Sequence, residues 1–101
     1  MIQKEECISG VVVKVNKKKS AWNESFGTKH NGLFCFPFQG GGGVVGFGEK
    51  EVLPGTKLNI LSEPKQYGET GVEVKFFIDG DNTIYSTYWV SFKHKVDKVN
   101  P

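Results

Sequence analysis

Lysines and large aromatic side chains occur together in the stretch from residue 17 to residue 30. Three consecutive lysines come first, and two aromatic residues, a further lysine and a histidine follow. Proteins that hold single-stranded nucleic acid neutralise phosphates with lysines and stack bases on aromatic rings, each stacked base contributing roughly 1–3 kcal/mol. The pattern predicts such contacts, although a tryptophan folded back over the end of the domain explains the same ring without a ligand. The residues expected to contact nucleic acid here are Lys17, Lys18, Lys19, Trp22, Phe26 and Lys29.

The segment from residue 84 to residue 96 has a similar composition and is expected to form one long strand. Successive side chains of a strand point to opposite faces, so one face would be apolar and would pack on the core. The other face would place lysines among Tyr85 and Trp89, which suits base stacking beside Lys93. A subunit interface suits the same face, because Tyr and Trp are enriched at interfaces as well. The expected core side consists of Ile84, Tyr88, Val90, Phe92 and Val96.

Phenylalanines stand at every second position in residues 34–38, so a strand would place all three rings on one face. A run of glycines follows and indicates a flexible connection beside that strand. Pro37 cannot donate a ladder hydrogen bond, which favours an edge or a bulge at this point. The rings belong either to the core or to a stacking platform. On the second interpretation Phe34 and Phe36 bind bases, together with Tyr67 at the tip of a later loop.

All 13 basic residues are lysines, set against 11 acidic residues, and the formal net charge is +2. Lysine neutralises phosphate as a flexible point charge, whereas arginine supplies the planar fork that reads guanine or clamps carboxylates. We therefore expect contacts to the nucleic-acid backbone with little sequence specificity. The nearly balanced charge supports a competing hypothesis, a phage- or plasmid-type protein-interaction or inhibitor module, because nucleic-acid-binding domains are usually strongly basic. A genomic bias toward lysine codons explains the composition without any ligand.

Catalytic, cofactor and metal chemistry find little support in the sequence. The run from Gly41 to Gly46 satisfies the G-x-G-x-x-G pattern, but a β-like segment follows it instead of the helix that a dinucleotide site requires. Asp79 and Asp81 lack the closing glutamate of a calcium loop and are expected to be turn residues of a hairpin. The histidines and cysteines lack the close spacing of a zinc motif, and both cysteines are expected to be reduced and buried. We therefore expect no enzyme activity, no cofactor and no metal.

Glycine-rich turns and many β-branched and aromatic residues predict an all-β domain with no helix. Residues 1–101 are expected to form a single domain with frayed ends at residues 1–6 and 97–101. Two long loops are predicted at residues 17–31 and 63–70. The expected architecture is a small five- to six-stranded antiparallel barrel. The predicted strands are residues 7–16, 32–38, 44–50, 56–62, 71–78 and 84–96.

A long glycine-containing strand, an aromatic strand, a weak third strand and a long hairpin, in this order over residues 7–96, resemble the OB fold. The plan is similar to that of small phage single-strand-binding proteins and of cold-shock domains. Phe34 and Phe36 stand where cold-shock domains carry aromatic motifs, while Pro37 and the missing basic-aromatic partner motif depart from that pattern. The resemblance implies a partner of single-stranded DNA or RNA. Because one small barrel gives limited contact, dimerisation or cooperative binding is expected.

No apolar run in the sequence is long enough to span a bilayer, and the first residues lack the apolar segment of a secretion signal. We therefore expect a cytoplasmic protein with no membrane partner. Carbohydrate binding through exposed tryptophan and tyrosine is a third interpretation, which suits a cytoplasmic chain less well.

Overall fold

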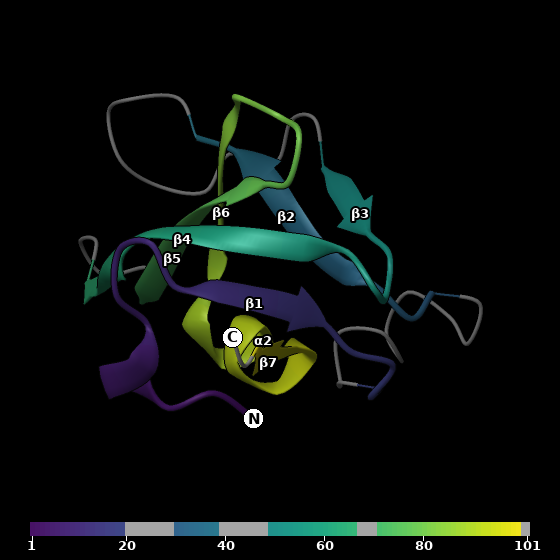
Figure 1. The fold of residues 1–101 in the computed structure, drawn as a ribbon, viewed down its shortest axis with the longest axis horizontal. Coiled ribbons are helices and arrows are strands. Elements are labelled where there is room, and N and C mark those ends of the chain that lie inside the picture. The colour runs from purple at the N-terminus through teal and green to yellow at the C-terminus, as the bar shows by residue number, and fades with distance from the viewer. Residues whose placement is uncertain (20–29, 39–48, 67–70, 100–101) are drawn as a thin grey trace.

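A computed structural model describes residues 1–19, 30–38, 49–66 and 71–99. The elements are η1 (Lys4–Glu6), β1 (Val12–Val15), β2 (Leu33–Pro37), β3 (Lys50–Val52), β4 (Lys57–Gln66), β5 (Val72–Ile78), β6 (Ile84–Tyr88), α2 (Trp89–Lys95) and β7 (Val96–Lys98). The seven strands form one curled antiparallel sheet, a half-barrel, in the order β3-β2-β6-β5-β4-β1-β7 (Figure 1). The prediction of an all-β, barrel-like fold is thus confirmed, with more strands than the five or six expected.

Alternation of buried and exposed side chains builds the core on one face of the sheet. In β5 the side chains of Val74, Phe76 and Ile78 are buried, whereas Lys75 and Phe77 are only partly buried. The period-two pattern predicted for the strand therefore holds from residue 74 to residue 78 but fails at Glu73, which is 1% exposed although it was expected opposite the core. Each fully buried apolar side chain contributes roughly 1.5–3 kcal/mol. The neighbouring strands β1, β2 and β4 complete the core with Val13, Val15, Leu33, Cys35, Leu58 and Ile60.

Residues 84–96 do not form the single strand predicted from their composition. Strand β6 is followed directly by α2, a helix of 7 residues, and the chain then returns to the sheet as β7. The prediction that the domain has no helix is therefore wrong. Helical spacing places Phe92 in the core, with its ring centroid 5.5 Å from that of Phe76, and leaves Val90 66% exposed. Packing of the aromatic side chains outweighs the strand propensity of this segment.

The register of β6 reverses the two faces that were predicted for this strand, so the side expected in the core faces away from it, and the alternation ends where α2 begins. Tyr85, expected on the ligand side, is buried in the core, and its ring lies 6.4 Å from that of Phe76 between centroids. Trp89 is partly buried against the same core. Val90, which was expected in the core, is exposed instead. The predicted face of alternating aromatic residues and lysines is therefore absent from this segment.

Lys95 is buried at the end of α2, where only 1% of the residue is exposed. Its Nζ donates hydrogen bonds to the carbonyl oxygens of Asn16 (3.0 Å), Lys18 (2.6 Å) and Asn31 (2.7 Å). Burial lowers the pKa of Lys95 and the charge of Lys19 adds to this effect, whereas the charge of Glu51 acts in the opposite direction. The three carbonyl acceptors also favour the ammonium form. The Lys95 ammonium therefore ties α2 to the segment that follows β1 and to the segment that precedes β2.

The turn between β5 and β6 has the chemistry predicted for it. Gly80 has a φ of +84°, which residues with a side chain rarely adopt. The Asp81 carboxylate accepts hydrogen bonds from the Thr83 N–H and from the Tyr85 hydroxyl, both at 2.8 Å. These bonds lower the pKa of Asp81. Asp81 is thus a turn residue, as its sequence context indicated.

Strand β2 lies inside the sheet, because it pairs with both β3 and β6, but within the described residues its end at Pro37 pairs with β6 alone. The Phe38 N–H donates to the Ile84 carbonyl on β6 at 2.8 Å, so the nitrogen of Pro37 is directed toward the β3 side. The described register with β3 ends at Cys35 opposite Lys50, before the proline is reached. The missing N–H of Pro37 therefore costs no described ladder bond.

Several segments expected to be irregular belong to regular structure. Strand β4 continues to Gln66, so residues 63–66 are not part of a loop as predicted. Ile2 lies in the core and its N–H donates to the Lys93 carbonyl at 3.3 Å, although the first residues were expected to fray. Asp97 belongs to β7, which pairs with β1. These contacts join the described N-terminal residues to α2 and the described C-terminal strand to the sheet.

Candidate nucleic-acid interface

The strand register assigns each side chain to one of the two faces of the sheet. Directly opposed residues of neighbouring strands share a face, and one face carries the core residues Val13, Leu58 and Ile78. The opposite face is the outer face, and it combines aromatic rings with lysines. Its described members include Val12, Lys14, Phe34, Phe36, Phe38, Lys57, Asn59, Lys75, Phe77, Ile84, Ser86 and Tyr88.

Phe34 and Phe36, which were predicted to bind bases, lie on the outer face but are almost inaccessible. They are 7% and 8% exposed, and the Phe34 ring centroid lies 5.5 Å from that of His30. Phe38 follows them on the same face and is only partly buried. Accessible aromatic surface on this segment is therefore found at Phe38, and in this arrangement a base cannot stack fully on either of the other two rings.

A row of partly buried side chains, the outer-face strip, crosses the outer face from the end of β2 to β1. Next to this strip the Nζ of Lys75 lies 4.0 Å from the centroid of the Phe38 ring. Such a cation–π contact is worth roughly 0.5–2 kcal/mol and holds the ammonium beside the ring. The outer-face strip consists of Phe38, Ile84, Phe77, Asn59 and Val12, each opposite the next.

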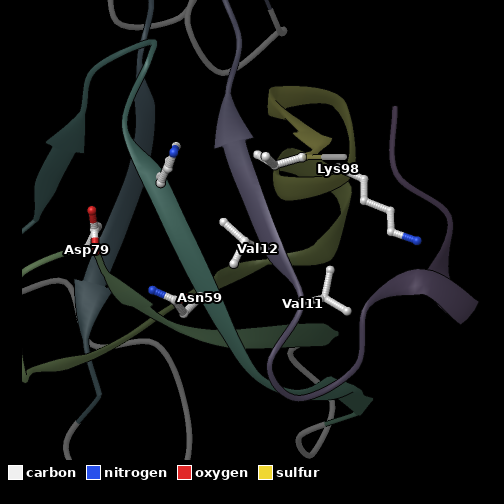
Figure 2. A pocket seen from close by; sticks show the side chains of 7 residues that line it. Val11, Val12, Asn59, Asp79 and Lys98 are labelled. Atoms are coloured by element: carbon white, nitrogen blue, oxygen red, sulfur yellow. The ribbon is translucent and has the colours of Figure 1, made fainter. Parts of the chain in front are cut away.

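A pocket of about 500 Å³ opens at the β1 end of the outer-face strip. Its apolar walls come from Val11, Val12 and Val99, and its polar groups include Asn59 and Asp79. Figure 2 shows Asn59 on β4, with Asp79 on one side of that strand and Val12 on the other. The pocket therefore places an amide and a carboxylate beside an apolar surface.

A second hollow shares Asn59 with this pocket and continues toward the β5–β6 turn. Phe77 and residues 80–82 line it, together with Ile78. Asn59 thus lies where the two hollows meet. The combined depression follows the outer-face strip from the partly buried Phe77 ring to Val12 of β1.

Exposed lysines border the depression on the outer face. Lys14 of β1 and Lys57 of β4 are directly opposite each other, and neither makes an ion pair within the described residues. Lys98 also lines the pocket, but its Nζ lies 3.9 Å from the Glu6 carboxylate and points toward the N-terminal segment in Figure 2. Asp97 flanks Lys14, and its hydrogen bond from the N-terminal ammonium lowers its pKa. Lys14 and Lys57 are therefore the cations best placed to meet a ligand.

The residues predicted to form one site are divided between different parts of the molecule. Lys17 and Lys18 are exposed after β1, while the Lys19 Nζ donates to the His30 carbonyl at 3.0 Å. Lys93 lies on α2 and is partly buried. Tyr85 and Trp89 pack in or against the core, as described above. Trp22, Phe26, Lys29 and Tyr67 lie outside the described residues.

The residues that form the outer-face strip and its basic border were largely missed as ligand contacts. The alternation of residues 71–78 already placed Lys75 and Phe77 opposite the core side chains, and this was the available signal. Asn59 gave a weaker signal of a binding site, because asparagine is disfavoured inside strands. The pairing of Lys57 with Lys14 depends on long-range register, which local sequence does not reveal.

Other kinds of site are not supported by the geometry of the described residues. They contain no group of three His, Cys, Asp or Glu side chains that could hold a metal ion. Cys7 and Cys35 are buried free thiols, as predicted, and burial raises the pKa of each to about 12, so neither is a reactive thiolate at neutral pH. The His30 Nδ1 lies 3.3 Å from the Glu51 Oε1, but the described structure places no nucleophile beside this pair.

Within the described residues, no helix has the length and apolar character needed to cross a membrane. No protein-family model, curated protein or solved structure matches the chain.

Proposed function

We propose that the protein binds single-stranded nucleic acid along its outer face, with little sequence specificity. The observation that carries this proposal is the outer-face strip, whose rings and apolar side chains lie beside three lysines. Bases would stack on Phe38 and Phe77, while Lys14, Lys57 and Lys75 would neutralise phosphates. Lysine contacts of this kind follow the backbone and not the base sequence.

The expected affinity is modest and should depend on salt. About three phosphate contacts give a slope of log affinity against log salt of about −2, since each contact to a single strand contributes about −0.7. Between about 50 and 200 mM salt the affinity should therefore fall by at least about tenfold. Lys17 and Lys18 are exposed beyond the end of β1 and could increase the slope.

Fluorescence anisotropy of a labelled thymidine oligonucleotide, measured at several salt concentrations, tests this proposal. Phe77→Ala should weaken binding by roughly tenfold, because one stacked base is lost. Lys57→Gln should weaken binding and reduce the salt slope by about 0.7. Lys4→Gln is the matched control, since Lys4 is an exposed lysine on η1, away from the outer face.

Absence of binding at low salt and micromolar protein would refute the proposal. So would equal losses of affinity in Lys57→Gln and Lys4→Gln, because the outer face would then have no special role. Thermal unfolding of each variant, followed by circular dichroism, shows whether a loss of binding reflects loss of the fold.

A protein partner is a second candidate, and exposed apolar side chains outside the outer face favour it. Leu53 is 59% exposed after β3, and Val90 is 66% exposed on α2. A homodimer formed through α2 would bury the exposed Val90 side chain of each copy. Sedimentation of wild type and Val90→Asp would distinguish this candidate: a dimer that dissociates in the variant supports it, and a monomer at high concentration opposes it.

We also propose that the half-barrel is related to the OB fold. The curled antiparallel sheet and the aromatic strand β2, which lies next to the edge strand β3, support this relation. An experimental structure in which the chain closes the sheet between β3 and β7 is the expected result. An open, flat sheet in that structure would oppose it.

A further inference from the structure

Asn59 occupies a position in β4 where an apolar residue would be expected. On the outer face its cross-strand neighbours are Val12 and Phe77, and asparagine is disfavoured inside strands. The residue is partly buried, yet its side-chain amide makes no hydrogen bond within the described structure. The amide is not among the buried polar atoms without a partner, so it remains in contact with solvent and accessible to a ligand. Asn59 therefore suggests a role in binding and not in packing.

Asp79 brings a second polar group without a partner to the same pocket. Its backbone N–H donates to the Lys57 carbonyl at 3.1 Å, which fixes the residue beside β4. Its carboxylate makes no hydrogen bond or ion pair among the described residues. The nearby Asp81 differs, because the Thr83 N–H and the Tyr85 hydroxyl occupy its carboxylate. Asp79 is thus the carboxylate of this turn that remains available to a ligand.

The shape of the pocket suits a flat ligand with a polar edge. Its volume of about 500 Å³ is within the range of roughly 300–1,000 Å³ found for small-molecule sites. Val12 offers an apolar surface for the face of a ring, and Val11 and Val99 extend the apolar lining. Asn59 and Asp79 offer hydrogen-bonding groups for the edge of the ring. Nucleobases are recognised in single strands by this combination of contacts to the ring face and to the base edge.

The chemistry of the two polar groups selects among the bases. A carboxylate has two acceptor oxygens and matches two adjacent donors. Guanine is the base whose Watson–Crick edge carries two adjacent donors, the N1–H and the exocyclic N2 amino group. Adenine and cytosine place an acceptor beside their donor, and thymine flanks its N3–H with two acceptors. An asparagine amide can also donate to the O6 or N7 of guanine.

We propose that the pocket between β1 and β4 is a guanine-preferring subsite on the outer face. Asp79 accepts hydrogen bonds from guanine N1–H and N2, Asn59 donates to O6 or N7, and the valines contact the face of the base. Lys57 and Lys14 lie beside the pocket, where the flanking phosphates would pass. This inference rests on the proposed function, and it adds a preference at one position to otherwise sequence-tolerant binding.

Competition between related oligonucleotides tests the subsite with the whole chain. The probes are a thymidine nonamer and versions with guanosine, adenosine or inosine at the central position. The guanosine version should bind roughly tenfold more tightly than the adenosine version, as expected for one bidentate contact to a base. Inosine lacks the N2 amino group and should lose most of this advantage. Equal affinity for guanosine and adenosine would overturn the inference.

Two variants assign the preference to the pocket. Asp79→Asn should abolish the guanosine preference and retain binding of the thymidine nonamer. Glu5→Gln is the control: it removes one exposed carboxylate on η1 and should retain the preference. Asn59→Val should reduce the preference without unfolding the domain, because valine is favoured in strands. A preference that survives in both Asp79→Asn and Asn59→Val would overturn the assignment.

An NMR titration with a mononucleotide distinguishes failure of this inference from failure of the proposed function. Guanosine monophosphate should shift the Asn59 side-chain amide resonances in an NMR spectrum of the labelled protein, and thymidine monophosphate should not. Binding of the thymidine nonamer without a guanosine preference would overturn the subsite and leave the proposed function intact. If no oligonucleotide binds, the proposed function fails, and an Asn59 shift with guanosine monophosphate would still support the subsite. Absence of that shift as well would overturn both.

Discussion

Replacing Lys95 by methionine should destabilise the domain strongly, although it removes a buried charge. Methionine has a similar length and fills the same space, but it offers no hydrogen-bond donor. The carbonyl oxygens of Asn16, Lys18 and Asn31 would then lose the ammonium that joins them. The substitution therefore tests whether this ammonium holds three segments of the chain together or is merely tolerated.

The magnitude follows from the three hydrogen bonds. A buried acceptor left without a partner costs about 1–3 kcal/mol, so three give a gross loss of about 3–9 kcal/mol. Water can reach part of this site, since the contacts of Lys95 are only partly buried, and methionine avoids the cost of desolvating a charge. We expect a net loss of about 2–4 kcal/mol out of the roughly 5–15 kcal/mol typical of a domain. The Tm should fall by roughly 8–30 °C, at about 4–8 °C for each kcal/mol.

Urea unfolding followed by circular dichroism measures this loss. Lys93→Met is the matched control, because it removes a lysine from the same helix whose ammonium makes no hydrogen bond or ion pair within the described structure. The control should change the free energy of unfolding by less than about 0.5 kcal/mol, as expected for a surface substitution. If Lys95→Met and Lys93→Met unfold at the same urea concentration, the three carbonyl contacts do not stabilise the fold and the reasoning is refuted.

Two further predictions concern the pH dependence of stability and the position of the helix. Burial raises the pKa of Glu51, but hydrogen bonds from the Gly32 N–H and from His30 outweigh it, so the pKa lies below the ordinary value of 4.5. The stability that this carboxylate contributes is present above pH 4.5 and is lost as the pH falls through the lowered pKa. In urea titrations, Glu51→Gln should therefore be less stable than wild type at pH 7 and as stable as wild type in acid. Phe92→Ala should cost about 3–5 kcal/mol because it empties core space, whereas Val90→Ala should change stability by less than about 0.5 kcal/mol. If Phe92→Ala and Val90→Ala lower the stability by similar amounts in thermal unfolding, the helical arrangement of this segment would be contradicted.

Local patterns in the sequence were sufficient to predict an element whose side chains alternate regularly along most of its length. The alternation of residues 71–78 and the Gly80 turn identified β5 and the hairpin, because strand geometry and turn chemistry are both local. The segment from residue 84 to residue 96 failed for the opposite reason. Its composition favours a strand throughout, and long-range contacts of the helix, such as the packing of Phe92 against Phe76, favour the helix instead. That contact joins distant parts of the chain and has no local signature.

The candidate site was harder to predict than the fold, because it depends on register. The pairing of lysines with aromatic residues was a sound criterion, but nearness in sequence was the wrong measure of nearness on the surface. Lys75 and Phe38 are far apart in the chain and in contact in the structure. Tyr85 and Lys93 were grouped because one strand was assumed to hold both, and α2 separates them. A surface of this kind becomes visible only when the strand order is known.

The structure shows how lysines are used in a chain that contains no arginine. An ammonium can direct three donors at three separate carbonyls, as Lys95 does, whereas the planar fork of arginine matches carboxylates and phosphates. Lys19 and Lys98 are likewise engaged by a carbonyl and a carboxylate of the chain itself. The composition alone therefore overstates the charge that is free to meet a ligand. The salt dependence of binding should follow the few lysines of the outer face and not the 13 of the sequence.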